Sequence, residues 1–206
     1  MTETKRPAIF LDRDGTLSHE VGYVNHPSRY RLYPWSVDAV RAINRAGWLA
    51  VLVTNQAGVA RGYFPEKVVH QVMDKLQKTM ESGGAHFDAV YVCLHHPTLG
   101  EPPYRKDCEC RKPRPGLLRR AEAELGADLS RSWVVGDRRS DLQVAWSVGA
   151  RGALVQTGYG RGELEYLATA CCYHELAGEW NDALQVSEKW LERAPDSMLV
   201  RRAYLR

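Results

Sequence analysis

The chain has 206 residues, a length that suits one α/β domain with a small appendage. Its formal net charge is only +3, so no strong electrostatic field favours nucleic acid or a membrane surface. No stretch approaches the roughly 20 apolar residues of a membrane span, and residues 1–7 lack the apolar core of a signal peptide. We therefore expect a cytoplasmic protein whose clustered Arg and Lys attract a small anion.

Apolar runs alternate along the chain with amphipathic helical segments. Strands are expected near Ile9 and at Leu49–Thr54, Phe87–Cys93, Trp133–Gly136 and Ala153–Val155. Helices are expected at Ser36–Ala46, Pro65–Glu81, Pro115–Leu125 and Ser140–Val148, with C-terminal stops at Gly47, Gly126 and Gly149. This alternation predicts an α/β fold with a parallel sheet and helices on both faces. Residues 14–54 hold only a loop and one helix, so no large cap domain is expected.

The first strand ends in the motif Asp12-Arg13-Asp14-Gly15-Thr16. Ligands bind at the carboxyl ends of strands in an open α/β sheet. Two carboxylates so close together are costly unless something neutralises them, and a divalent cation is the simplest candidate. The alternative is an acidic turn that closes a helix N-terminus.

Three more polar groups follow later apolar runs. Thr54 ends the second strand, Arg111-Lys112 precedes a helix, and Asp137 ends a later strand with Asp141 four residues on. In this order, the sequence resembles the haloacid dehalogenase (HAD) phosphatase superfamily from about residue 8 to residue 158. The resemblance implies a three-layer, Rossmann-like HAD fold over residues 1–160.

Phosphate monoester hydrolysis explains why these residue types occur together, because catalysis there depends on positioning and charge stabilisation. Asp12 can attack phosphorus as a nucleophile, and Asp14 can protonate the leaving alkoxide and then activate water. Thr54 and Lys112 would hold the phosphoryl oxygens. Asp12, the Asp14 carbonyl and Asp137 would hold Mg²⁺. The resemblance assigns the same roles, and Asp141 is expected to order the loop rather than to bind metal.

A second metal pattern lies in the loop before Lys112. Cys93, His95, Cys108 and Cys110 form a C-x-H … C-x-C arrangement that suits tetrahedral Zn²⁺. The alternative is a set of reduced, buried thiols, and His96 is a second candidate for the histidine ligand. We expect a structural zinc, because the loop has little apolar content to order it. Such a zinc-stabilised loop would hold Arg111 and Lys112 over the substrate.

The zinc loop resembles that of the histidinol-phosphatase and heptose-bisphosphate-phosphatase group. The stretch from Thr54 to Gly62 looks like the heptose enzymes, which implies D-glycero-D-manno-heptose 1,7-bisphosphate 7-phosphatase activity in nucleotide-activated heptose biosynthesis. The substrate-binding residues would be Glu20, Gly22, Tyr23, Asn55, Gln56, Arg111 and Arg138. Ser18, Glu20, Ala57 and Arg138 differ from the residues common at these positions, which leaves the substrate and its anomer open.

Residues 161–206 are expected to form a helical extension, a C-terminal hairpin. Gly178-Glu-Trp180, Trp190 and Pro195 resemble a tetratricopeptide (TPR) repeat, although one repeat cannot bury its apolar face alone. The alternative is an ordinary C-terminal helix.

Three functions follow: a phosphatase for a small phosphosugar, a histidinol-phosphate or other sugar-bisphosphate phosphatase, and a non-catalytic module that presents the helical tail to a protein partner. No nucleic-acid or membrane partner is expected.

Overall fold

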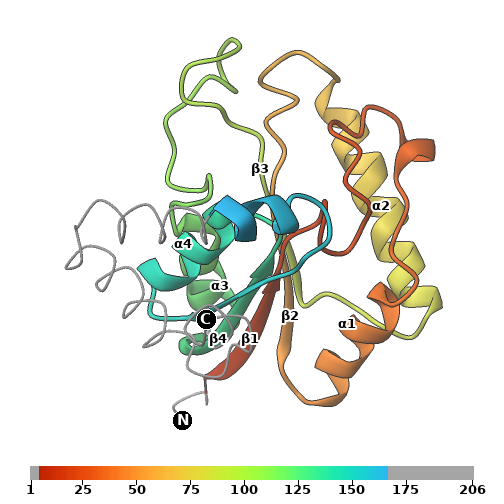
Figure 1. Ribbon diagram of the computed structural model, residues 1–206, viewed down its shortest axis with the longest axis vertical. Helices are drawn as coiled ribbons and strands as arrows, with labels where there is room; N and C mark the ends of the chain where they lie inside the picture. The colour runs from red at the N-terminus through yellow and green to blue at the C-terminus, as the bar shows by residue number, and fades with distance from the viewer. Residues whose placement is uncertain (1–4, 167–206) are drawn as a thin grey trace.

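Five parallel strands form one sheet, in the order β3-β2-β1-β4-β5, in the computed structural model, which describes residues 5–166 (Figure 1). The strands are β1 (Arg6–Leu11), β2 (Leu49–Asn55), β3 (Ala89–Cys93), β4 (Ala127–Gly136) and β5 (Arg151–Leu154). The helices are α1 (Ser36–Arg45), α2 (Glu66–Ser82), α3 (Gly116–Leu125), α4 (Arg139–Ser147) and the short 3-10 helix η1 (Pro27–Arg29). The predicted α/β class, the parallel sheet and the order of elements are confirmed.

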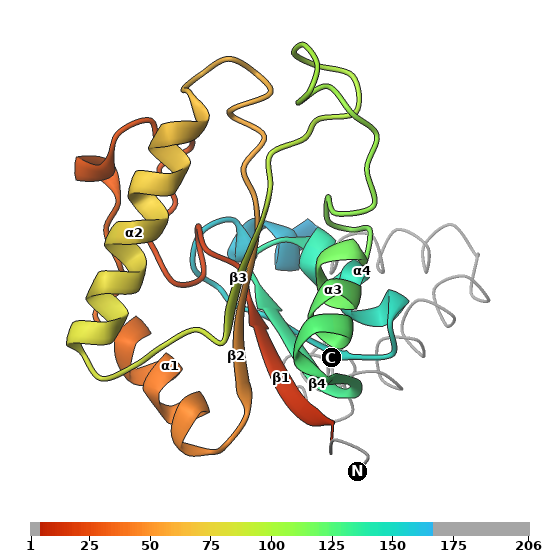
Figure 2. The same ribbon diagram turned by 180° about the vertical axis from the view of Figure 1, so that it is seen from behind.

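Both faces of the sheet are covered, so β2, which lies between β3 and β1, is buried along nearly its whole length. Its alternate residues serve two apolar cores, as the two-residue period of a strand requires. Leu49, Val51 and Val53 belong to the core that includes α3 and α4 residues. Ala50 and Leu52 belong to the core that includes α1 and α2 residues. The two ribbon views show the same division, with α1 and α2 on one side of the sheet and α3 and α4 on the other (Figures 1 and 2).

Strand β4 is longer than the sequence predicts, because polar residues hide its first half. The expected start was Trp133, yet Ala127 and Asp128 already pair with the start of β1. The register between β1 and β4 shifts between Pro7 and Ile9. The Ser132 hydroxyl lies in this irregularity and accepts a hydrogen bond of 2.8 Å from the Ala8 amide. A buried amide without a partner is thereby avoided.

The parallel arrangement brings the loops after β1, β2, β3 and β4 to one end of the sheet (Figure 1). Residues 12–35, between β1 and α1, contain only η1, so the described part of the chain has no cap domain at this position. No helix within residues 5–166 has the length and apolar character needed to cross a bilayer. A helix begins at residue 160 and is described to residue 166. The predicted hairpin and the TPR-like segment lie outside the described residues.

Candidate active site

A cavity of about 380 Å³ opens where the predicted motifs meet at the carboxyl ends of the strands. It contains every residue that the sequence predicted to catalyse the reaction or to bind substrate: Asp12, Asp14, Glu20, Gly22, Tyr23, Thr54, Asn55, Gln56, Arg111, Lys112 and Arg138. The structure adds further lining residues that were not predicted, including Arg61, Ser140 and Tyr159.

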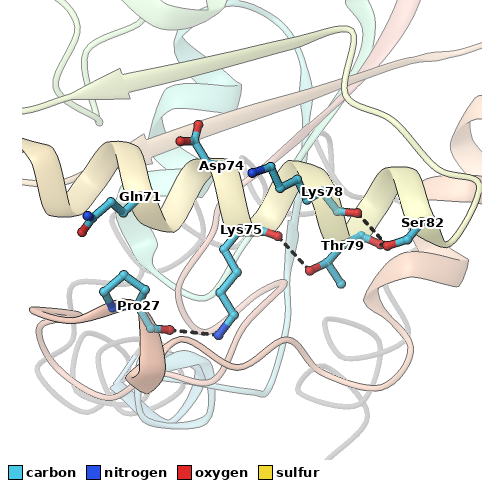
Figure 3. A pocket seen from close by; sticks show the side chains of 7 residues that line it. All are labelled: Pro27, Gln71, Asp74, Lys75, Lys78, Thr79 and Ser82. Atoms are coloured by element: carbon cyan, nitrogen blue, oxygen red, sulfur yellow. Dashed lines mark hydrogen bonds between the residues drawn. The ribbon is translucent and has the colours of Figure 1, made fainter.

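A second hollow, of about 530 Å³, runs along α2 and shares no lining residue with the first cavity (Figure 3). Six of its seven lining side chains are exposed, and the ammonium group of Lys75 is already bound to the Pro27 carbonyl oxygen at 2.9 Å. Catalytic groups are usually found where burial and neighbouring charges shift their pKa values. The groove along α2 has no buried titratable side chain among its lining residues, so the candidate site is the smaller cavity.

Three buried carboxylates gather beside this cavity, as the pairing of β1 with β4 dictates. Leu11 pairs with Val135, so the segments after β1 and β4 leave the sheet at the same level. This brings Asp12 next to Asp137. Ligand oxygens of these two residues and of Asp141 all lie within 4.8 Å of one another. The Oδ1 atom of Asp137 is buried and has no hydrogen-bond partner among the described residues. A buried, unsatisfied carboxylate oxygen in an acidic cluster fits a hard cation such as Mg²⁺.

The backbone closes tightly around this cluster. Gly15 has φ +78°, and a Cβ atom there would lie 2.0 Å from Oδ2 of Asp137. That oxygen also accepts a hydrogen bond of 2.9 Å from the Tyr159 amide. Only glycine at position 15 leaves room for the carboxylate.

Lys112 connects the acids. Its buried Nζ atom lies 2.7 Å from Oδ1 of Asp12, 2.6 Å from Oδ1 of Asp141 and 2.9 Å from the Val53 carbonyl oxygen. Although burial alone would lower the pKa of Lys112, the charges of the two aspartates raise it above its ordinary value. Oδ2 of Asp141 accepts a hydrogen bond from the Arg138 amide at the start of α4. Asp141 thus both orders the loop and fixes Lys112.

The Asp14 carboxylate is held by a buried arginine. Arg13, which is 1% exposed, donates to both Asp14 oxygens at 3.0 and 2.6 Å. Gln56 donates to Oδ2 of Asp14 at 3.0 Å and accepts from Arg13 at 2.9 Å. The guanidinium group therefore neutralises the second acid of the motif, while Lys112 neutralises the first. Burying a charge is tolerated only with such partners.

Two predicted substrate-binding amides are engaged with the protein itself. The Asn55 side chain accepts from the Lys112 amide and donates to the Lys112 carbonyl oxygen, both at 3.1 Å. Gln56 also donates to the Thr54 hydroxyl at 2.9 Å, which leaves the Thr54 hydroxyl hydrogen free to donate into the cavity. Both amides thus orient the groups beside them, and direct contact with substrate stays a prediction.

The outer wall of the cavity combines aromatic rings with charged groups. Glu20 accepts a hydrogen bond of 2.5 Å from the Gly22 amide, and burial raises its pKa. The Arg138 guanidinium lies 3.8 Å from the centre of the Tyr159 ring, a cation–π contact that fixes its direction. Tyr23 packs edge-on against Tyr63 at 4.5 Å.

The four predicted zinc ligands converge in the loop after β3. The three sulfur atoms of Cys93, Cys108 and Cys110 lie 3.1 to 3.7 Å apart, and Nδ1 of His95 lies 3.2 Å from the Cys110 sulfur. Tetrahedral Zn²⁺ with bonds of about 2.3 Å places its sulfur ligands about 3.8 Å apart. Burial raises the pKa of the Cys93 thiol, so a thiolate there needs a cation. His95 rather than His96 belongs to this cluster, and the residues fit zinc.

The raised pKa values of two acids predict how Mg²⁺ binding depends on pH. Burial raises the pKa of Asp12 to about 7 and that of Asp137 to about 6. Without metal, the folded protein holds these protons more tightly than the unfolded chain, so this contribution lowers stability as pH rises toward about 7. Mg²⁺ binds the ionised forms, and we expect it to raise Tm more at about pH 8 than at about pH 5. Differential scanning fluorimetry measures both increments. The D137N variant should lose the increment at the higher pH, and an increment independent of pH would contradict the assignment.

Sequence reasoning missed two arginines in or beside the cavity. Arg13 stands between the two acids of the motif. A charged residue directly after a buried strand indicates that its charge is paired inside the protein, here with Asp14. Arg61 follows the Thr54 motif at a distance that no spacing rule identifies. Tyr159 comes from the loop after β5 and carried no sequence signal.

Comparison with known proteins agrees with this geometry. The model of the HAD-hydrolase-like family matches residues 109–174. A protein of Escherichia coli K12 named D-glycero-beta-D-manno-heptose-1,7-bisphosphate 7-phosphatase is 39% identical over 153 residues, which cover 74% of this chain and 80% of that protein. A D-glycero-D-manno-heptose-1,7-bisphosphate 7-phosphatase of Thermosynechococcus vestitus is 43% identical over 78% of this chain and 84% of that protein.

A solved structure is also similar. The D,D-heptose 1,7-bisphosphate phosphatase of B. bronchiseptica, complexed with magnesium and phosphate, has a TM-score of 0.71 and 35% identity. The match covers 78% of this chain and 86% of that one.

Proposed function

Because this chain belongs to the heptose-1,7-bisphosphate 7-phosphatase family of HAD hydrolases, we propose that it removes the C7 phosphate of D-glycero-D-manno-heptose 1,7-bisphosphate. It is a phosphoric monoester hydrolase by family and fold. The observation that carries the assignment is the buried cluster of Asp12, Asp137 and Lys112 beside a cavity lined by additional arginines. The reacting phosphate would bind at the end of the cavity that holds Asp12 and Lys112. The arginines can bind a second anionic group.

In the first half of the reaction, a carboxylate oxygen of Asp12 attacks phosphorus, and the bond between phosphorus and the C7 oxygen breaks. The product is an aspartyl-phosphate on Asp12 and the sugar alcohol. Asp14, in its protonated form, supplies the proton to the departing oxygen. Since Arg13 and Gln56 occupy both oxygens of Asp14, this carboxyl group must turn away from them to reach the leaving group.

In the second half, Asp14 takes a proton from water, and the water oxygen attacks phosphorus. The bond between phosphorus and Asp12 breaks, which releases inorganic phosphate and the free carboxylate. The Thr54 hydroxyl and the Lys112 ammonium donate to the phosphoryl oxygens, where charge accumulates in both steps. To do so, Lys112 exchanges one of its present contacts for a phosphoryl oxygen.

The carboxylates of Asp12 and Asp137 and the Asp14 carbonyl would hold Mg²⁺, which supplies positive charge that shields the phosphoryl group. Asp141 lies near enough to be a ligand, but its oxygens already serve Lys112 and the Arg138 amide. It therefore acts on the metal site indirectly.

The nearest alternative substrate is histidinol phosphate, which carries one phosphate and a cationic side chain. We expect kcat/KM for the heptose bisphosphate to exceed that for histidinol phosphate at least about 100-fold, because the cavity arginines would lose their second anion. Phosphate release from both bisphosphate anomers and from histidinol phosphate measures the ratio. Faster turnover of histidinol phosphate would overturn the substrate assignment.

The non-catalytic alternative, a module that presents the tail to a partner, has less support. An idle domain would have no need to keep Lys112 buried between two carboxylates, an arrangement that is costly outside catalysis. We also propose a cytoplasmic location, since Cys93, Cys108 and Cys110 form a zinc-type cluster rather than disulfides, as suits a reducing compartment. A helical tail with a protein partner stays a prediction.

A further inference from the structure

Three arginines that line the cavity have no acidic partner within residues 5–166. Arg61, Arg111 and Arg138 form no ion pair with a described carboxylate, whereas Arg13 and Lys112 are both paired. The chemistry at the reacting phosphate already uses Lys112, Thr54 and the acid cluster. The unpaired guanidinium groups therefore remain for a different anion.

Arg61 differs from the other two because it comes from the segment between β2 and α2. It is partly buried, and its Nη2 atom lies 3.1 Å from Nε2 of His96 in the zinc loop, residues 94–107. Arg111 is also tied to this loop, since its Nη1 atom donates to the His95 carbonyl oxygen at 3.3 Å. Two adjacent histidines thus contact two cavity arginines, while His95 alone faces the cysteines.

The zinc loop is docked on the segment that carries Arg61 at two further points. Gly100 has φ +86°, and a Cβ atom there would lie 1.8 Å from the Ala60 carbonyl oxygen, so the two backbones touch. The Tyr104 hydroxyl donates a hydrogen bond of 2.6 Å to Oε2 of Glu66 at the start of α2. These two contacts hold the chain on both sides of Arg61 against the zinc loop.

We propose that Arg61 binds the phosphate of the substrate that is not hydrolysed, and that the zinc loop positions the segment that carries it through the contacts at Ala60 and Glu66. This inference rests on the proposed function, because it requires a substrate with two phosphates. A guanidinium group presents paired N–H donors that match two phosphate oxygens, and a fixed guanidinium loses less entropy on binding. The zinc loop is thereby part of substrate selection as well as of stability.

The first test is the R61A variant with two substrates. For the heptose bisphosphate, KM should rise at least about tenfold, the loss expected for a charged hydrogen bond, with kcat nearly unchanged. For p-nitrophenyl phosphate, which has no second phosphate, kcat/KM should stay at the wild-type value. R61K should recover part of the loss, since it restores the charge without the paired donors.

Controls separate substrate binding from a merely structural role. R105A removes an exposed arginine of the same loop, paired with Glu101 outside the cavity, and should leave both substrates unaffected. Y104F removes the hydrogen bond that docks the zinc loop on Glu66, and it should raise KM for the bisphosphate alone, at wild-type zinc content.

Two results would overturn the inference alone: an R61A variant with wild-type KM for the bisphosphate, or an equal loss on both substrates. If the wild-type enzyme turned over monophosphates better than the bisphosphate, the proposed function would fall as well.

Discussion

Replacing Asp12 by asparagine is expected to lower kcat at least about 10⁴-fold, the scale of loss seen when an enzyme loses its nucleophile. The amide cannot form the acyl phosphate, and it contributes no charge to a metal ion. The fold should persist, because burial raises the pKa of Asp12 to about 7 and the neutral amide removes a poorly solvated charge. Lys112 keeps its contact with Asp141 in this variant.

Steady-state phosphate release measures the effect, and near-ultraviolet circular dichroism with Tm checks the fold. The matched control is D74N, which changes an exposed aspartate in the groove along α2 and should retain wild-type activity. A D12N enzyme with full activity would show that another group attacks phosphorus.

Replacing Cys108 by serine is expected to lower bound zinc well below one ion per chain and to destabilise the fold. A structural zinc contributes its binding free energy to folding, so losing one of four ligands should cost at least about 3 kcal/mol. For a chain of this size, that loss corresponds to a fall in Tm of roughly 6 to 12 °C. The effect should reach the active site, because Arg111 is hydrogen-bonded to the loop at the His95 carbonyl oxygen.

Zinc content by atomic emission, together with Tm and KM, tests this expectation. C171S is the control, since this cysteine lies outside the predicted ligand set and should leave zinc content and Tm unchanged. Full zinc occupancy and wild-type stability in C108S would refute the structural role.

The proximity of Asp12 and Asp137 could be predicted from sequence because each directly follows a buried strand. Parallel pairing then forces Asp12 and Asp137 together, whatever the rest of the chain does. The helix ends were predictable for a similar local reason: Gly126 ends α3 with φ +65°, a conformation that favours glycine. At these positions the residue type and the sheet topology both predict the structure that is observed.

What the sequence could not show is how neighbouring groups divide their hydrogen bonds. Asn55 and Gln56 stand where substrate contacts were expected, yet their amides hold Lys112 and Asp14. Likewise, Arg61 lines the cavity from a segment whose Ala60 backbone lies against Gly100 of the zinc loop. These relations depend on long-range packing, which no motif spacing encodes.

The most direct test is a crystal structure of the protein with Mg²⁺ and beryllium trifluoride, which mimics a phosphoryl group bound to a carboxylate. We expect beryllium bonded to Asp12 and one Mg²⁺ shared by Asp12 and Asp137. Beryllium on another side chain, or a Mg²⁺ that touches neither of these aspartates, would contradict the proposed chemistry.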